Sequence, residues 1–228
     1  MQVSKERGIS KTVEMSLTKL KDFAAYPVMK RRNASKTFLV GGKPYHYFVH
    51  HYNSTWRNER AVEVPLAAEL LTSAAPGARC LEVGNVLNYY LREPRTVVDK
   101  YEPSRGVINQ DILEFGAPGS FDVIVSISTL EHVGWDENPR EPGKVIRALN
   151  HMKALLAPGG HCLVTFPLGY NSELDDLVFA SKLEFRKIHY LKRLNLENDW
   201  LEVERDAVRS VAYGSPFQHA NAIFVGID

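Results

Sequence analysis

Apolar positions recur along the chain with two different periods. Between Glu59 and Ser73 they return at steps of three and four residues, which predicts a helix. Pro65 lies inside this stretch, so the sequence predicts a kink or two shorter helices there. The segments from Gly143 to Ala157 and from Glu173 to Lys182 show the same helical period.

Short, nearly continuous apolar segments separate these helices and predict strands. They are Arg79–Val83, Thr96–Val98, Phe121–Ile127 and His161–Phe166. Because such strands alternate with helices, we expect an α/β domain with a Rossmann-like, mostly parallel sheet and helices on both faces. Three later segments predict strands of an antiparallel C-terminal edge: Phe185–Tyr190, Trp200–Glu204 and Ala222–Ile227.

The first part of the chain differs in character. Residues 1–58 are predicted to form an N-terminal extension and an aromatic-rich cap, and residues 59–228 the main domain. Gly41, Gly42 and Pro44 predict a turn inside the cap. Polar aromatic side chains gather after this turn, up to Trp56.

Composition narrows the class of protein. The 228 residues include 28 Lys plus Arg and 27 Asp plus Glu, so the net charge is +1. A dedicated nucleic-acid binder is expected to be more basic, and no apolar run is long enough for a membrane span. Cys80 and Cys162 lie in strand-like segments, which indicates buried thiols and a reducing, cytoplasmic location. The sequence does not indicate an oligomeric state.

Polar side chains follow three predicted strands at their carboxyl ends, where open parallel sheets bind ligands. Gly84 lacks a Cβ, so a ligand can approach the backbone after the first strand. Asp99 follows the second strand and could accept hydrogen bonds from ribose hydroxyls. Asp111 could accept one from an adenine amino group, with Ile112 against the ring. The pattern predicts a nucleoside cofactor.

Two nucleoside cofactors fit this arrangement. A nicotinamide dinucleotide carries a pyrophosphate, and its turn usually needs the pattern G-x-G-x-x-G. Here Gly84 is followed by Asn85, Val86 and Leu87. S-adenosylmethionine carries no phosphate and has a positive sulfonium, so an acidic, glycine-poor turn favours it.

The stretch from Arg79 to Tyr170 resembles the class I S-adenosylmethionine-dependent methyltransferases. The motifs that carry the resemblance are Glu82-Val83-Gly84, Asp99, Phe121-Asp122-Val123-Ile124-Val125-Ser126, Leu130-Glu131-His132-Val133 and Leu155-Leu156-Ala157-Pro158-Gly159-Gly160. The last two together are the most distinctive. The resemblance covers roughly ninety residues.

The resemblance implies a sheet of seven strands, the last one antiparallel, and roles for several residues. Glu82 and Gly84 are expected near the methionine part of the cofactor, Asp99 at the ribose, and Asp111 with Ile112 at the adenine. We expect further cofactor contacts from Asn85, Ser128 and Arg60, the last near the cofactor carboxylate.

The sequence departs from the family pattern in two places. The first motif lacks the usual second and third glycines. Only eleven residues separate Asp99 from Asp111, whereas a crossover helix needs about a dozen or more. We therefore expect an open adenine side.

His132 is the candidate general base, because an alcohol nucleophile must lose its proton during methyl transfer. Its neighbour Glu131 is the second candidate catalytic residue, although the pair could instead be structural. Some relatives bind a divalent metal through Glu-x-x-Glu-His. Ser128 occupies the first of these positions here, so no metal is expected.

The candidate substrate-binding residues are His51, Tyr52, Trp56 and Tyr170, with Asn171 and Tyr213 as further pocket walls. The segment around the first three could form a lid over the site or an ordinary packed cap. We expect a small-molecule acceptor, methylated on oxygen or less favourably on nitrogen, and possible acceptors include a sugar or secondary metabolite. The alternatives are a non-catalytic module of the same fold, a nicotinamide-dependent oxidoreductase and a nucleic-acid methyltransferase.

Overall fold

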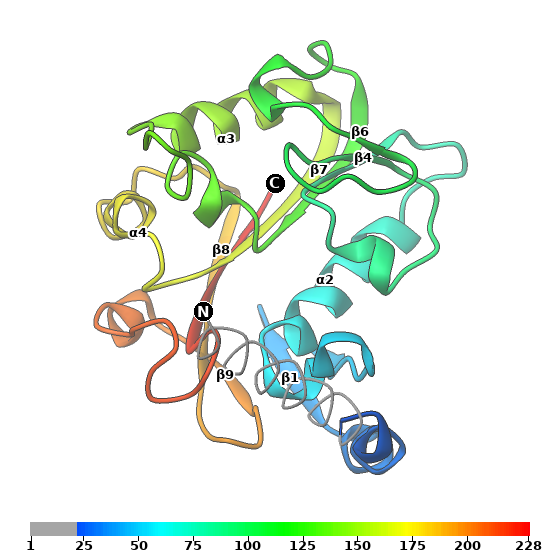
Figure 1. Ribbon diagram of the computed structural model, residues 1–228, viewed down its shortest axis with the longest axis vertical. Helices are drawn as coiled ribbons and strands as arrows, with labels where there is room; N and C mark the ends of the chain where they lie inside the picture. The colour runs from blue at the N-terminus through cyan, green and yellow to red at the C-terminus, as the bar shows by residue number, and fades with distance from the viewer. Residues whose placement is uncertain (1–21) are drawn as a thin grey trace, which may run out of the picture.

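A mixed sheet of eight strands forms the centre of the protein, in the order β5-β4-β3-β6-β7-β10-β8-β9 (Figure 1). The computed structural model describes residues 22–228. The strands are β3 (Cys80–Val83), β4 (Thr96–Val98), β5 (Val107–Ile108), β6 (Phe121–Ile127), β7 (Leu156–Pro167), β8 (Lys187–Arg193), β9 (Trp200–Val203) and β10 (Ala222–Ile227). The Rossmann-like prediction is confirmed.

The pairing of neighbouring strands changes once along this sheet, from parallel to antiparallel. The pairs from β5 to β7 are parallel, whereas β10 pairs antiparallel with both β7 and β8. The antiparallel C-terminal edge is confirmed, but the predicted number of seven strands is wrong. The predicted strand at Trp200–Glu204 is present as β9, and the strand that the sequence did not predict is β5, which has two residues and pairs parallel with β4.

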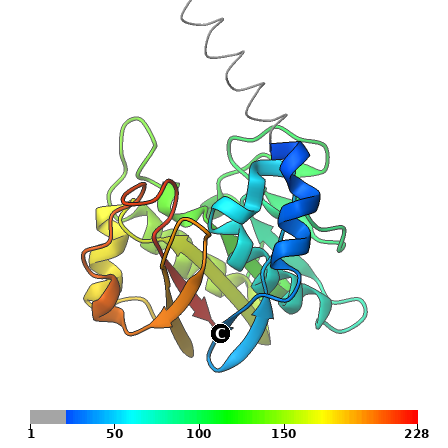
Figure 2. The same cartoon turned by 90° about the horizontal axis from the view of Figure 1, so that it is seen from below.

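Helices cover the sheet on both faces (Figure 2). One hydrophobic core lies under α3 (Lys144–Leu155) and α4 (Ser172–Phe179). The other lies under α2 (Arg60–Thr72) and the hairpin of β1 (Thr37–Val40) and β2 (Lys43–His46). Short 3-10 helices occupy the connections: η1 (Tyr52–Arg57), η2 (Leu87–Tyr89), η3 (Ile112–Glu114), η4 (Leu130–His132) and η5 (Arg205–Val208).

Pro65 does not divide α2, which runs unbroken from Arg60 to Thr72, so the prediction of two shorter helices is wrong. Proline cannot donate a backbone hydrogen bond to the carbonyl four residues earlier, which belongs to Ala61. The backbone N–H of Phe48 donates to that Ala61 oxygen instead, at 2.8 Å. The cap segment therefore satisfies the carbonyl that the proline leaves free, and the helix continues.

The cap is joined to both ends of the main domain. Residues 22–33 are helical, and the turn predicted at Gly41 and Gly42 connects β1 to β2 with both glycines at positive φ. Trp200 donates its backbone N–H to the Tyr47 hydroxyl at 2.7 Å. The domain boundary predicted after residue 58 falls one residue before the N-cap of α2, and residues 1–21 of the predicted extension lie outside the described part.

The connection between β4 and β5 contains no helix, as its length predicts. Residues 99–106 instead form a short loop at the carboxyl end of β4. Among residues 22–228, no helix is long and apolar enough to cross a membrane.

Candidate functional site

A cavity of about 540 Å³ opens where β3, β4 and β6 end. Parallel strands place their carboxyl ends on one edge, so residues distant in sequence meet there. Its walls are Val83, Gly84, Asn85, Val86, Val98, Asp99, Lys100, Tyr101, Glu102, Pro103, Gln110, Asp111, Ile112, Ser128, Thr129, His132, Val133 and Glu137. Of the predicted cofactor residues, all but Glu82 and Arg60 line it.

Gly84 is required by a contact within the protein. Its φ is +89°, and a Cβ at this position would lie 2.0 Å from the Thr129 hydroxyl oxygen. The turn after β3 therefore packs directly against the turn after β6. The sequence predicted a glycine for the approach of a ligand, whereas the close neighbour in the structure is Thr129.

Glu82 shapes the same turn from beneath. Its carboxylate is buried and accepts hydrogen bonds from the backbone N–H groups of Val86 at 2.8 Å and Leu87 at 2.6 Å. Arg95 donates to the other oxygen at 2.6 Å. Because both oxygens are engaged and Glu82 does not line the cavity, this carboxylate holds the glycine-poor turn in place.

Two carboxylates, Asp99 and Glu102, lie where the cavity meets the end of β4. Asp99 accepts from the backbone N–H groups of Asn85, Tyr101 and Glu102, at 3.0, 2.9 and 2.8 Å. Glu102 accepts from the Asn85 side chain at 2.9 Å and from the Tyr89 hydroxyl. Glu102 was not predicted from the sequence, although its position three residues after Asp99, at the end of a strand, could have indicated it as a site residue.

Another part of the cavity wall is formed by Val98, Ile112 and a group of ion pairs. Ile112 is buried and lines the cavity. Asp111 accepts from the Leu113 backbone N–H at 3.1 Å and pairs with two lysines. Lys144 lies 2.7 Å and Lys100 3.0 Å from its Oδ2.

These ion pairs continue to Glu137, which also contacts both lysines, at 2.8 Å from Lys144 and 3.3 Å from Lys100. We call Lys100, Lys144, Asp111 and Glu137 the balanced cluster. Burial acts to raise the pKa of Asp111, but the hydrogen bonds from Lys144 and the Leu113 N–H outweigh it and lower that pKa to about 2. Asp111, which was predicted to accept a hydrogen bond from the adenine amino group, thus forms ion pairs with two lysines.

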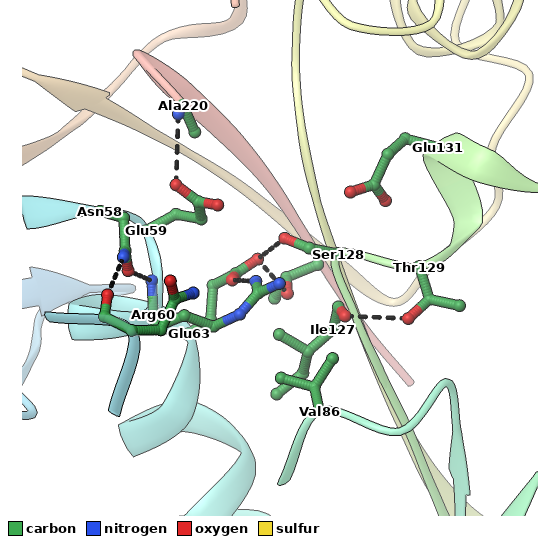
Figure 3. A network of polar contacts seen from close by, with 12 residues as sticks. Asn58, Glu59, Arg60, Glu63, Val86, Ile127, Ser128, Thr129, Glu131 and Ala220 are labelled. Atoms are coloured by element: carbon green, nitrogen blue, oxygen red, sulfur yellow. Dashed lines mark hydrogen bonds and ion pairs between the residues drawn. The ribbon is translucent and has the colours of Figure 1, made fainter. Parts of the chain in front are cut away.

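The opposite side of the site holds a second buried group of charges (Figure 3). Glu63 accepts from Ser128 Oγ at 2.8 Å and from Thr165 Oγ1 at 2.7 Å, and it pairs with Arg60. Ser128 has a positive φ of 37°, which turns the chain sharply after β6. Arg60 therefore lies at the base of the turn that lines the cavity.

Two further carboxylates adjoin Arg60. Glu59 accepts from the Ala220 backbone N–H at 3.2 Å, and Glu131 points toward the group from the other side (Figure 3). Within residues 22–228, Glu131 Oε2 has no hydrogen-bond partner. Burial and the nearby Glu63 charge raise the pKa of Glu131 well above its ordinary range. We call Glu59, Arg60, Glu63 and Glu131 the acid-rich cluster.

His132 stands at the edge of the cavity in a hydrogen-bonded triad. Its Nδ1 lies 2.5 Å from Asp136 Oδ2, and the Tyr170 hydroxyl donates to the same oxygen at 2.7 Å. Burial acts to raise the pKa of Asp136, but the bonds from His132 and Tyr170 leave it below its ordinary value. Because a carboxylate only accepts, Nδ1 is the donor in this bond, while Nε2 lies 3.6 Å from Glu131 Oε1.

The sequence named His132 but did not predict its partner Asp136. The i, i+4 spacing of the two residues was the available signal. Tyr170 was predicted as a substrate contact, and the structure brings it to the triad, with its ring 4.9 Å from that of His132 and 5.1 Å from that of Tyr213. Asn171 is buried and donates to the Glu131 carbonyl at 2.9 Å.

The predicted lid residues divide into two groups. His51 and Tyr52 are exposed, and they line a separate cavity beside η1. Trp56 is buried, with its ring 6.3 Å from that of Tyr26 in the N-terminal helix. Trp56 thus packs inside the cap. Over residues 22–228, no set of three His, Cys, Asp or Glu side chains is grouped to hold a metal ion.

Comparison with known proteins identifies the family. A family model described as a methyltransferase domain matches residues 49–204. Among solved structures, the N-methyltransferase NodS from Bradyrhizobium japonicum WM9, in complex with S-adenosyl-L-homocysteine, is 16% identical. The comparison covers 74% of this chain and 85% of that one, with a TM-score of 0.48.

Two further solved structures are similar. A possible histamine N-methyltransferase from Thermotoga maritima is 14% identical over 70% of this chain and 86% of that one, with a TM-score of 0.40. An S-adenosylmethionine-dependent methyltransferase from Archaeoglobus fulgidus is 14% identical over 74% and 94%, with a TM-score of 0.43. A search of curated proteins finds no match.

The family model spans more than half of the chain and contains the strand-end motifs that build the cavity. The nicotinamide-dependent and non-catalytic alternatives are therefore set aside. The chain belongs to the class I S-adenosylmethionine-dependent methyltransferases.

Proposed function

We propose that this methyltransferase transfers the methyl group to an oxygen of a small molecule, with His132 as the general base. The observation that carries the proposal is the bond between His132 Nδ1 and Asp136 Oδ2, at 2.5 Å, on the wall of the cavity. An alcohol must lose a proton during transfer, whereas a neutral amine can attack without prior deprotonation. A histidine held in position as a general base therefore favours an oxygen acceptor over a nitrogen acceptor.

The residues around the cavity fit S-adenosylmethionine. A volume of about 540 Å³ lies within the usual range for cofactor sites. Glu102 and Asp99 offer carboxylate oxygens for ribose hydroxyls, and Val98 with Ile112 offers an apolar surface for the adenine. When bound, the cofactor supplies a methyl group on a positive sulfonium, which the excess of carboxylates in the acid-rich cluster favours.

We assign a separate task to each chain residue near the reaction. His132 Nε2 accepts the proton of the acceptor hydroxyl while the new C–O bond forms. Asp136 is a positioning residue, because it holds the imidazole in the tautomer that leaves Nε2 free. Arg60 is assigned to the cofactor carboxylate, since guanidinium groups pair well with carboxylates. Glu82 positions the turn and does not contact the cofactor.

The experiment begins with binding. Calorimetric titration with S-adenosylhomocysteine is expected to give binding by the wild type, and weaker binding by Glu102→Gln and Asp99→Asn. Both substitutions keep a hydrogen-bonding side chain of similar size, so the fold is retained more readily than in alanine variants. A folded wild type without binding would overturn the assigned cofactor residues.

Turnover then tests the base. Release of S-adenosylhomocysteine is measured with separate pools of sugars, phenols and amines as acceptors. His132→Ala is expected to lower kcat by about 10²–10⁴-fold with unchanged binding of S-adenosylhomocysteine. His161→Ala, at an exposed histidine on β7, is the matched control. Asp136→Asn should lower kcat and change its pH profile. Full activity of His132→Ala, or methylation of amines alone, would contradict the proposal.

A further inference from the structure

A second cavity of about 610 Å³ lies beside η1, outside the site described above. It is lined by Asp22, Phe23, His51, Tyr52, Asn53, Ser54, Arg57, Gln218 and His219. Its walls come from the cap and from the loop before β10, two parts of the chain that are distant in sequence. We propose that this cavity binds a neutral saccharide ring and is the acceptor subsite, an inference that rests on the proposed small-molecule methyl transfer.

The cavity is connected to the cofactor side through a stacked pair of tyrosines. The Tyr52 and Tyr89 rings lie 4.4 Å apart and 6° from parallel. Tyr89 donates its hydroxyl to Glu102, which lines the cofactor cavity. A ligand against Tyr52 is thus one aromatic pair away from that cavity.

A second connection runs through the loop before β10. Gln218 and His219 precede Ala220, whose backbone N–H donates to Glu59 at 3.2 Å (Figure 3). Glu59 belongs to the acid-rich cluster with Arg60, so both walls of the second cavity are anchored to residues of the first site. This placement supports a subsite for the molecule that receives the methyl group.

The backbone of the cavity wall is held in a strained form. Asn53, Ser54 and His219 have φ values of 55°, 44° and 71°, in the left-handed region that non-glycine residues rarely adopt. Hydrogen bonds maintain these conformations: Asn58 donates to the Asn53 carbonyl at 2.8 Å, and Gly214 donates to that of His219 at 2.8 Å. Strain that is maintained by the surrounding structure is typical of ligand sites.

The side chains indicate the class of ligand. Tyr52 and Phe23 are exposed and present apolar ring faces, the surface on which the C–H face of a sugar packs. Within residues 22–228, no side-chain hydrogen bond is formed by His51, Gln218 or His219. These groups can donate and accept, as sugar hydroxyls require.

Charge points to a neutral ligand. The acid and the arginine of the cavity wall, Asp22 and Arg57, pair with each other at 3.0 Å. Neither an anionic nor a cationic ligand would find an unpaired opposite charge among these described residues. A neutral ring with several hydroxyl groups satisfies both the aromatic and the polar walls.

The test is direct binding of methyl glycosides of common hexoses to the full chain, measured by saturation-transfer NMR and titration. We expect wild-type binding, weakened on the order of tenfold in Tyr52→Ala through loss of the stacking face. His51→Ala should weaken binding as well, and His46→Ala, at an exposed histidine on β2, should not. In methyl-transfer assays, Tyr52→Ala should raise KM for the acceptor and leave kcat nearly unchanged.

Three outcomes would overturn the inference. They are no glycoside binding by the folded wild type, binding that both Tyr52→Ala and His51→Ala leave intact, and displacement of the glycoside by adenosine at the second cavity. Glycoside binding requires neither turnover nor cofactor. A failure to bind S-adenosylhomocysteine would therefore count against the proposed function, while a failure to bind glycosides would count against the acceptor subsite alone.

Discussion

Two groups of charges flank the candidate site, and they differ in their burial and in their ratio of acids to bases. The balanced cluster joins Lys100 and Lys144 to Asp111 and Glu137. The acid-rich cluster holds Glu59, Glu63 and Glu131 around the single cation Arg60. The pKa of Asp111 is lowered to about 2, whereas that of Glu63 is raised.

The comparison shows that burial alone does not decide the protonation of these acids. Burial acts to raise the pKa of Asp111 and Glu137 in the first cluster and of Glu63 and Glu131 in the second. Two lysines outweigh it in the balanced cluster, whereas one arginine shared among three acids does not outweigh it in the other. The first cluster is a structural clamp, and the second favours a positively charged occupant nearby.

The segment from Glu131 to Glu137 has one end in each cluster and carries His132 and Asp136 between them. Glu137 pairs with Lys144, and Glu131 adjoins the acid-rich cluster. His132 and Asp136 are therefore held at both sides of a short loop. Changes in either cluster are expected to act on this loop in different ways.

The largest effect is expected from Lys144→Met. Removing the buried cation leaves Asp111 and Glu137 with only the half-exposed Lys100, and loss of one partner of a buried pair costs about 3–5 kcal/mol. Urea denaturation at neutral pH measures the free energy of unfolding. The matched control is Lys43→Met in the exposed pair with Glu69, where the change should stay below about 1 kcal/mol. Equal effects in the two variants would show that the ion pairs of Lys144 stabilise the protein no more than an exposed pair does.

An acid titration of stability should give the next largest effect. The Asp111 pKa is about 2 in the folded protein, below the ordinary value of 3.8. This carboxylate therefore contributes about 2 kcal/mol above pH 4, and the contribution is lost as the pH falls from about 4 to 2. Asp111→Asn should flatten the dependence of unfolding free energy on pH in that window. An unchanged slope would show that Asp111 is not held by the lysines.

The smallest effect has the opposite sign and comes from Glu131→Gln. The pKa of Glu131 is raised in the folded protein, so the unfolded chain releases its proton first and stability falls as the pH rises above about 4.5. The variant removes this penalty and should be more stable than the wild type by about 1 kcal/mol at pH 8, with less gain at pH 4.5. Thermal denaturation at the two pH values measures it. A variant less stable at pH 8 would mean that Glu131 has an ionic partner.

The fold was largely predictable because its signal is local. The period of apolar residues located α2, β4 and β6 to within a residue or two. The count of strands failed at β5, because a two-residue edge strand carries too little pattern to be separated from a loop. The division of α2 expected at Pro65 does not occur. The Ala61 carbonyl, which Pro65 leaves without its helical donor, accepts the backbone N–H of Phe48 from a distant part of the chain.

The site was predicted in outline and altered in detail. Sequence placed Asp99, Ile112 and His132 on the correct edge of the sheet, and all three line the cavity. The sequence did not reveal that Glu82 accepts hydrogen bonds from Arg95 and two backbone N–H groups. It also did not reveal that Asp111 forms ion pairs with lysines. It also missed Asp136 and Glu102, since acids in loops are common and only their partners make them distinctive.

The sequence by itself determined the order of strands and helices, the strand ends that meet at one edge, and the family motifs they carry. Those features depend on residues near one another in the chain. Only the tertiary structure decided which carboxylates are free, which are paired and which are protonated. The reason is that the energy of a buried charge depends on the few groups within hydrogen-bonding distance, and here those groups come from distant parts of the chain.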